Sequence, residues 1–180
     1  MNDDNTTKSK KGLAIKIIIP VLLVCAIAGI WAAKNSKKDM DSVDVVNPDF
    51  VLHVTETIDL DKLKSYGLPI IIDFGADSCI PCKEMAPVLK KLNAELIGKA
   101  IIRFVDVWKY QQLAQGFPVE LIPTQIFFDA EGKPFKPQSP EEMQMKLYST
   151  RDTNEHVFTA HEGGMTKEQM LRALKEMGMK

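Results

Sequence analysis

The chain has 180 residues, of which 45% are hydrophobic and 26% are charged, and its formal net charge at pH 7 is −1. This composition is typical of one globular domain with its own hydrophobic core and some additional sequence. A net charge near zero, without a basic patch in the globular part, gives no electrostatic reason to expect nucleic acid as a partner.

The beginning of the chain has the pattern of a membrane anchor. Residues 1–12 are polar and contain lysines, and residues 13–33 are apolar apart from one charge, Lys16. The uncharged residues 17–33 are near the shortest length that crosses a bilayer, and Lys16 can extend the segment by reaching the interface. We therefore predict a single transmembrane signal anchor over residues 13–33, with residues 1–12 in the cytoplasm.

Two alternatives to a retained anchor remain at this stage. The sequence at residues 26–28 resembles a signal-peptide cleavage site, and Cys25 could carry the lipid of a lipoprotein. A buried position for Cys25 within a membrane helix is favoured over lipidation. Residues 34–48 are polar and charged, so we interpret them as a tether to a domain on the outer side of the membrane.

Residues 49–180 are predicted to form one α/β domain. Apolar runs predict strands at residues 49–55, 68–74, 100–107, 124–129 and 156–164. Amphipathic patterns with capping residues predict helices at residues 59–67, 80–97, 108–117 and 166–178, the last with a capping box of Thr166 and Gln169. This order combines parallel crossovers with a closing hairpin, which indicates a mixed sheet flanked by helices.

An insertion is expected between the last two strands, at residues 136–155. Ser139 and Pro140 have the pattern of a helix N-terminus, so a short helix is predicted there. Such a segment could dock a partner, cover a site or be a tolerated surface insertion.

The three cysteines are the most informative residues of the domain and its anchor. Cys79 and Cys82 are separated by two residues, and no second pair of this kind exists. A structural zinc site needs four ligands, and the three histidines are isolated, so no metal is expected. A disulfide across so short a loop restricts the unfolded chain only slightly. The pair is therefore interpreted as a redox couple that works without a cofactor.

The residues around this pair complete a recognisable set. Cys79-Ile80-Pro81-Cys82 follows a strand and opens a helix, Asp73 precedes Cys79 by six residues, and Ile122-Pro123-Thr124 precedes a later strand. With Gly163 near the end of the chain, this set resembles the thioredoxin family over about residues 49–178. The resemblance implies the thioredoxin fold, a central mixed sheet flanked by helices, here with an N-terminal transmembrane helix.

The resemblance also implies roles for these residues. Cys79 should attack a client disulfide, since a helix N-terminus stabilises its thiolate, and Cys82 should resolve the mixed disulfide. Asp73 should assist proton transfer at the buried cysteine. Pro123 should be a cis-proline beside the cysteines, and Ile80, Pro81, Ile122 and Pro123 should contact the substrate.

Four positions depart from the family pattern. Gly75 and Ser78 stand where thioredoxin has tryptophans, and Phe104 stands where a buried lysine would accompany Asp73. Ile80 replaces the usual glycine between the cysteines. A buried carboxyl without its cationic partner is expected to titrate at a higher pH, so Asp73 should have a raised pKa.

Together these features predict a single-pass, extracytoplasmic thiol–disulfide oxidoreductase of a bacterial cell envelope. The reducing direction is favoured, with substrate protein disulfides, such as those of apocytochrome c, as clients and a CcdA/DsbD-type membrane protein as electron donor. A disulfide oxidase or isomerase, a copper-handling metallochaperone and a redox-inactive adaptor are the alternatives. Six methionines could bind copper: Met143, Met145, Met165, Met170, Met177 and Met179. Helical spacing indicates that several of them belong to the core instead.

Overall fold

Two apolar strands form the centre of the sheet in the computed structural model, which describes residues 47–180. β2 (Ile70–Gly75) and β3 (Ile101–Asp106) pair in parallel, and every residue of both strands is buried. Strands covered on both faces need apolar side chains on both sides, which explains why these runs lack alternation. The strands predicted at residues 68–74 and 100–107 are confirmed, with small shifts at their ends.

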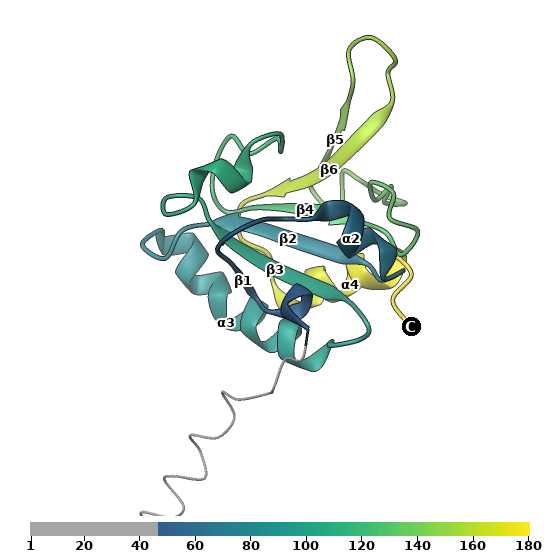
Figure 1. Ribbon diagram of the computed structural model, residues 1–180. Helices are drawn as coiled ribbons and strands as arrows, with labels where there is room; N and C mark the ends of the chain where they lie inside the picture. Colours follow the sequence, from purple (N-terminus) through teal and green to yellow (C-terminus); the bar gives the residue numbers. More distant parts are fainter. Residues whose placement is uncertain (1–46) are drawn as a thin grey trace, which may run out of the picture. The chain divides into compact units, whose positions relative to one another are not determined.

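The described residues form a six-stranded mixed sheet in the order β1-β3-β2-β4-β6-β5. β1, β3 and β2 run parallel, whereas β4, β6 and β5 join by antiparallel pairing. The β5–β6 hairpin extends beyond the rest of the sheet (Figure 1). The bounds of these strands are β1 (His53–Val54), β4 (Thr124–Phe128), β5 (Met145–Ser149) and β6 (His156–Glu162).

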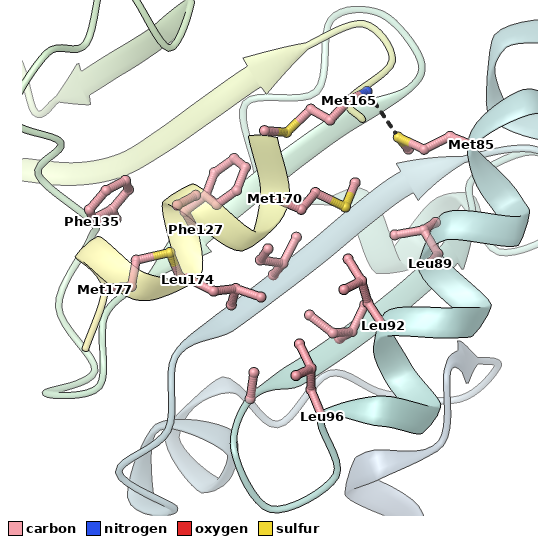
Figure 2. Packing of buried hydrophobic residues seen from close by; sticks show 14 of the residues in the cluster. Met85, Leu89, Leu92, Leu96, Phe127, Phe135, Met165, Met170, Leu174 and Met177 are labelled. Carbon is pink, nitrogen blue, oxygen red and sulfur yellow. Dashed lines mark hydrogen bonds between the residues drawn. The ribbon is translucent and has the colours of Figure 1, made fainter. Parts of the chain in front are cut away.

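Helices cover both faces of the sheet. α3 (Ile80–Glu95) and α4 (Lys167–Glu176) pack on one face, and α2 (Leu60–Ser65) packs on the other. Figure 2 shows how leucines of α3 and methionines of α4 meet over the sheet. All of the methionines considered above as copper ligands are buried in this core or packed against it, which agrees with their interpretation as core residues.

Local capping explains where these helices begin. The Asp59 side chain accepts a hydrogen bond from the backbone N–H of Lys62 at the start of α2, and Thr166 forms the predicted capping box with Gln169 at the start of α4. Each bond satisfies a backbone donor that has no partner within the helix. The helices predicted at residues 59–67, 80–97 and 166–178 are confirmed.

Two elements at the edges of the domain differ from the prediction. Residues 49–55 are not one strand, because Pro48–Phe50 form a 3-10 turn (η2) and only β1 remains extended. The turn is held by Asn47, whose side chain accepts from the N–H of Asp49. The helix predicted at residues 108–117 is wrong as well, since only Gln111–Ala114 (η3) form a 3-10 helix.

The insertion also folds differently from the prediction. Residues 140–144 form a turn rather than a helix, and the chain then enters β5, which the sequence analysis missed. β5 pairs with β6 along its whole length, so the backbone groups on its inner side are bonded to a strand that lies later in the chain. The extra residues therefore enlarge the sheet at its edge.

The predicted membrane anchor, its alternatives and most of the tether fall on residues 1–46, outside the described residues. Within residues 47–180, no helix combines the length and the hydrophobicity needed to cross a bilayer.

Candidate redox site

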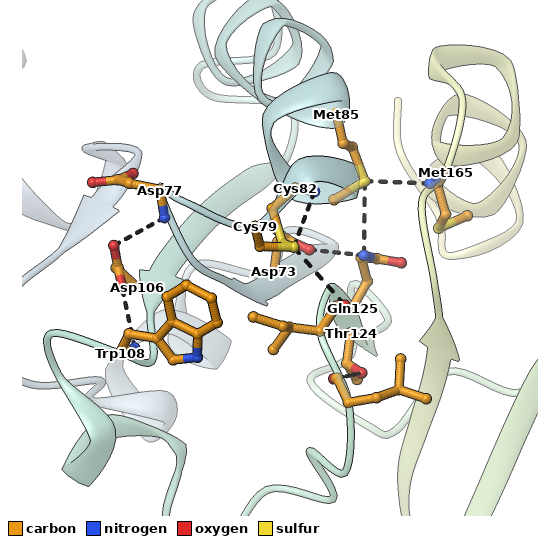
Figure 3. Close-up of a disulfide and its surroundings, with 12 residues drawn as sticks. Asp73, Asp77, Cys79, Cys82, Met85, Asp106, Trp108, Thr124, Gln125 and Met165 are labelled. Atoms are coloured by element: carbon orange, nitrogen blue, oxygen red, sulfur yellow. Dashed lines mark hydrogen bonds between the residues drawn. A yellow bond between two sulfur atoms is a disulfide. The ribbon is translucent and has the colours of Figure 1, made fainter.

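Cys79 and Cys82 form a disulfide at the N-terminus of α3 (Figure 3). Cys79 is the N-cap residue of this helix, and its sulfur accepts a hydrogen bond from the backbone N–H of Cys82 at 3.3 Å. Pro81 lies in the first turn, where a missing N–H breaks no helical hydrogen bond. Once the disulfide is reduced, the same N–H and the helix dipole stabilise a thiolate on Cys79.

The two sulfurs differ in accessibility. Cys79 is 8% exposed and Cys82 is 3% exposed, whereas Ile80 between them is 72% exposed. An incoming disulfide can therefore reach Cys79 more easily than Cys82, and it meets the side chain of Ile80 first. This asymmetry supports different roles for the two cysteines.

The loop before β4 brings a backbone carbonyl next to the attacking sulfur. The Ile122–Pro123 peptide bond is cis, and the carbonyl oxygen of Ile122 lies 4.0 Å from Sγ of Cys79. This loop is tied to the end of β6 because the N–H of Gly163 donates to the carbonyl of Pro123 at 2.8 Å. The carbonyl of Ile122 is thus held beside Cys79.

Asp73 lies on β2 beneath the cysteines and has no solvent exposure. Its Oδ1 accepts a hydrogen bond from Nε2 of Gln125 at 2.7 Å, while its Oδ2 has no partner among the described residues. Burial raises the pKa of Asp73 to about 7, although the hydrogen bond from Gln125 acts in the opposite direction. The burial expected for this carboxyl is confirmed.

Asp73 and Cys82 both pack closely around the backbone of Gly75. A Cβ atom added to Gly75 would lie 3.2 Å from Sγ of Cys82 and 3.4 Å from Oδ2 of Asp73. The free carboxyl oxygen and the sulfur therefore lie near the same point, beside the backbone of Gly75. Phe104, the strand neighbour of Asp73 on β3, supplies a buried aromatic ring instead of a cation.

A cavity of about 390 Å³ opens on another side of Cys82. Its mostly apolar lining includes Leu52, Ala76, Pro87 and Phe104. This hollow gives water a route to the buried sulfur.

Asp106 at the end of β3 fixes the loop that leads to Cys79, a role that the sequence analysis missed. Its Oδ2 accepts from the N–H of Asp77 at 3.1 Å, and its Oδ1 accepts from the N–H groups of Trp108 and Lys109. Burial acts to raise the pKa of Asp106, but the backbone donors outweigh it and hold this pKa below the usual value. An acidic residue at the end of an apolar strand was the available signal.

Three further residues near the site were not predicted. Gln125 and His161 are buried polar residues on β4 and β6, and Trp108 is 63% exposed beside the disulfide. A glutamine within the apolar run of residues 124–128 was a visible signal, because buried amides need partners. Neither Trp108 nor His161 carries a local pattern that separates it from an ordinary surface or strand residue.

Within residues 47–180, no three histidine, cysteine or acidic side chains gather where they could hold a metal ion. The chemistry that the arrangement supports is thiol–disulfide exchange at one dithiol pair with a buried carboxyl as proton acceptor.

Comparison with known proteins agrees with this class of site. The thioredoxin family model matches residues 51–150. Thioredoxin 1 of Chlorobaculum tepidum is 39% identical over 75 residues, which are 42% of this chain and 73% of that protein. Thioredoxin H4 of Arabidopsis thaliana is 40% identical over 74 residues, 41% of this chain and 62% of that protein. The bifunctional thioredoxin reductase/thioredoxin of Mycobacterium leprae is 33% identical over 93 residues, 52% of this chain but only 20% of that protein.

One solved structure adds support for the fold alone. A mutant thioredoxin from Halobacterium salinarum NRC-1 superposes with a TM-score of 0.50 at 24% identity, covering 74% of this chain and 96% of that chain. Fold, site and sequence thus define a member of the thiol–disulfide oxidoreductase class. The chain belongs to the thioredoxin family.

Proposed function

We propose that this protein is a membrane-tethered, extracytoplasmic thiol–disulfide oxidoreductase that reduces disulfides in client proteins. The observation that carries the proposal is the Cys79–Cys82 pair at the start of α3, with the Ile122 carbonyl 4.0 Å from Cys79. The buried carboxyl of Asp73 completes the site.

The first step is attack on the client. The Cys79 thiolate attacks one sulfur of the client disulfide, a mixed disulfide forms, and the other client sulfur leaves as a thiolate that takes a proton from water. Ile80, Pro81, Ile122 and Pro123 contact the client chain around the two reacting sulfurs.

The second step releases the client. The carboxylate of Asp73 takes the proton from the Cys82 thiol, and the Cys82 thiolate attacks Sγ of Cys79. The mixed disulfide breaks, and the second client sulfur leaves as a thiolate that is then protonated. The client has gained two electrons, and Cys79 and Cys82 are left as a disulfide.

The disulfide must be reduced again before the next turnover. Residues 13–33 carry the predicted anchor, which would hold the domain on the outer side of the membrane. Electrons for its reduction would then have to cross the membrane, so a CcdA/DsbD-type membrane protein is the proposed donor. The name of the Mycobacterium leprae relative pairs a thioredoxin with a thioredoxin reductase, which makes such a reductase the competing donor.

The reduction potential of the Cys79–Cys82 couple tests the direction of electron flow. The full chain is equilibrated in defined thiol buffers and the fraction of disulfide is measured. A reductant is expected to give roughly −250 mV or below. A value of roughly −120 to −180 mV would instead identify an oxidase or isomerase.

Separate experiments test the location and the donor. After cell membranes are washed at alkaline pH, the chain should remain in the membrane fraction. Protease added to intact cells should digest the domain, because the domain is proposed to lie outside the cytoplasmic membrane. Loss of the reduced form in cells that lack the membrane donor would support the CcdA/DsbD-type partner. Loss only in cells that lack thioredoxin reductase would contradict it.

A further inference from the structure

We infer that Gln125 and His161 are positioning residues for Asp73. Gln125, which His161 orients, occupies one carboxyl oxygen of Asp73 and leaves the other oxygen, near Cys82, to receive the proton. This inference rests on the proposed function and adds two residues to its proton-transfer step.

The three side chains form a row across the sheet. Asp73 on β2 is the strand neighbour of Gln125 on β4, and Gln125 is the strand neighbour of His161 on β6. Asp73 and Gln125 have no exposure, and His161 is 2% exposed. Polar groups at such depth are hydrogen-bonded to each other because water cannot reach them.

The hydrogen bonds fix the orientation of the Gln125 amide. Its Nε2 donates to Oδ1 of Asp73 at 2.7 Å and to the sulfur of Met85 at 3.7 Å, as Figure 3 shows. Its Oε1 lies 3.0 Å from Nδ1 of His161 and has to accept. Nδ1 of His161 therefore carries the hydrogen.

His161 is suited to this role because its burial favours the neutral imidazole. Burial lowers the pKa of His161, although the Gly163 backbone and the charge of Glu162 oppose that shift. A neutral imidazole with its hydrogen on Nδ1 donates to Gln125 without placing a positive charge in the core.

The arrangement selects the oxygen that is protonated. Oδ1 of Asp73 accepts from Gln125, whereas Oδ2 has no hydrogen bond among the described residues. Oδ2 and Sγ of Cys82 both lie near the point that a Cβ atom of residue 75 would occupy, so Oδ2 is the carboxyl oxygen placed toward Cys82. In the transfer, the S–H bond of Cys82 breaks, an O–H bond forms at Oδ2, and the electron pair left on sulfur attacks Cys79.

No charged group among the described residues lies against Asp73, where it could set the Asp73 pKa in place of Gln125. β3 presents Phe104, α3 presents Cys82 and Met85, and β6 presents His161 behind Gln125. Apart from burial, the hydrogen bond of Gln125 is the only described influence on this carboxyl.

The test is a direct titration of Asp73 by carbon-13 NMR on the full chain in its disulfide form. Gln125→Met keeps the side-chain volume but removes the donor, so the Asp73 pKa should rise by about one pH unit or more. His161→Leu removes the hydrogen bond that orients the Gln125 amide and should raise the Asp73 pKa by a smaller amount. His161→Gln retains an N–H donor and should restore much of the original value.

A second readout follows the chemistry. The rate at which Cys82 resolves a preformed mixed disulfide is measured against pH, and its midpoint should move with the Asp73 titration. Thr159→Val is the matched control, because Thr159 is a fully buried polar residue of β6 that makes no hydrogen bond to Gln125. The control should leave both curves unchanged.

The two readouts separate the positioning role of Gln125 and His161 from the role of Asp73 as the base. An unchanged Asp73 titration in folded Gln125→Met and His161→Leu proteins would overturn the positioning role, whatever the enzyme does. A shifted titration with an unshifted resolving rate would overturn the assignment of Asp73 as the base. Shifts in both curves, absent from Thr159→Val, would support the inference.

Discussion

The ring of Phe104 occupies the space that a side chain at position 75 would need. A Cβ atom added to Gly75 would lie 2.9 Å from Cε2 of Phe104, which is closer than Cβ contacts in real structures. The glycine and the phenylalanine are two separate departures from the family pattern in the sequence, yet in the fold they form one packing unit. This unit places an aromatic edge beside the resolving cysteine.

The first prediction concerns this unit. Gly75→Ala should destabilise the domain by about 1–3 kcal/mol, because the added methyl group forces the ring of Phe104 to move. Phe104→Leu should cost about 1 kcal/mol alone through lost packing but should relieve much of the damage in the double variant. Denaturant unfolding of all four proteins measures the coupling. Strictly additive effects would show that the two positions do not share this space.

The second prediction concerns the pH dependence of stability. The pKa of Asp73 is raised from 3.8 to about 7 in the folded state, so the folded protein loses stability as pH rises from about 4 to 7. Asp73→Asn removes this loss and should be more stable than the parent at pH 8, on the order of 2–4 kcal/mol. The two proteins should have similar stability at pH 4. Unfolding curves at both pH values check this, and equal stability at pH 8 would contradict it.

The third prediction concerns the loop before Cys79. Asp106 has a lowered pKa, so it stabilises the fold above the ordinary carboxyl pKa and this contribution disappears as pH falls through the folded value. Asp106→Asn should lose about 1–2 kcal/mol at pH 7 and little at strongly acidic pH. Asp129→Asn is the control, since Asp129 also accepts from two backbone N–H groups but in a distant turn. Hydrogen exchange should speed up at Asp77 only in the first variant.

The fourth prediction concerns client binding. Trp108 is 63% exposed next to the disulfide, in the loop that Asp106 holds. Trp108→Ala should raise KM for a protein client about 3-fold to 10-fold, which corresponds to roughly 1 kcal/mol of lost contact, while reaction with a small dithiol stays the same. Leu147→Ala removes a 41% exposed side chain on β5 and serves as the control. An equal loss with both substrates would assign Trp108 to structure rather than to client contact.

Local sequence was enough to predict most elements that position the cysteines. Continuous apolar runs identify β2 and β3 because both strands are covered on both faces. The N-cap role of Cys79 and the early Pro81 mark the start of α3. The burial of Asp73 follows from a single acidic residue in an apolar strand.

The elements that were missed depend on partners elsewhere in the chain. β5 has only one buried residue, Met145, and it is extended because it pairs with β6. The helix predicted at residues 108–117 is interrupted at Tyr110, whose backbone (φ −127°, ψ 54°) is not helical. The pairing of Gln125 with His161 was invisible for the same reason as β5, because strand order decides which side chains become neighbours.

The two ends of the sheet have a consequence for association between molecules. β1 offers only two residues at one edge. At the other edge, β5 has one buried residue, Met145, followed by mostly exposed side chains that include Lys146. Lys146 is paired with Glu162 of β6, so a charge sits on the outermost strand. A short edge and a charged edge both resist the addition of a strand from another chain. Many copies of this domain can therefore be crowded together without their sheets joining.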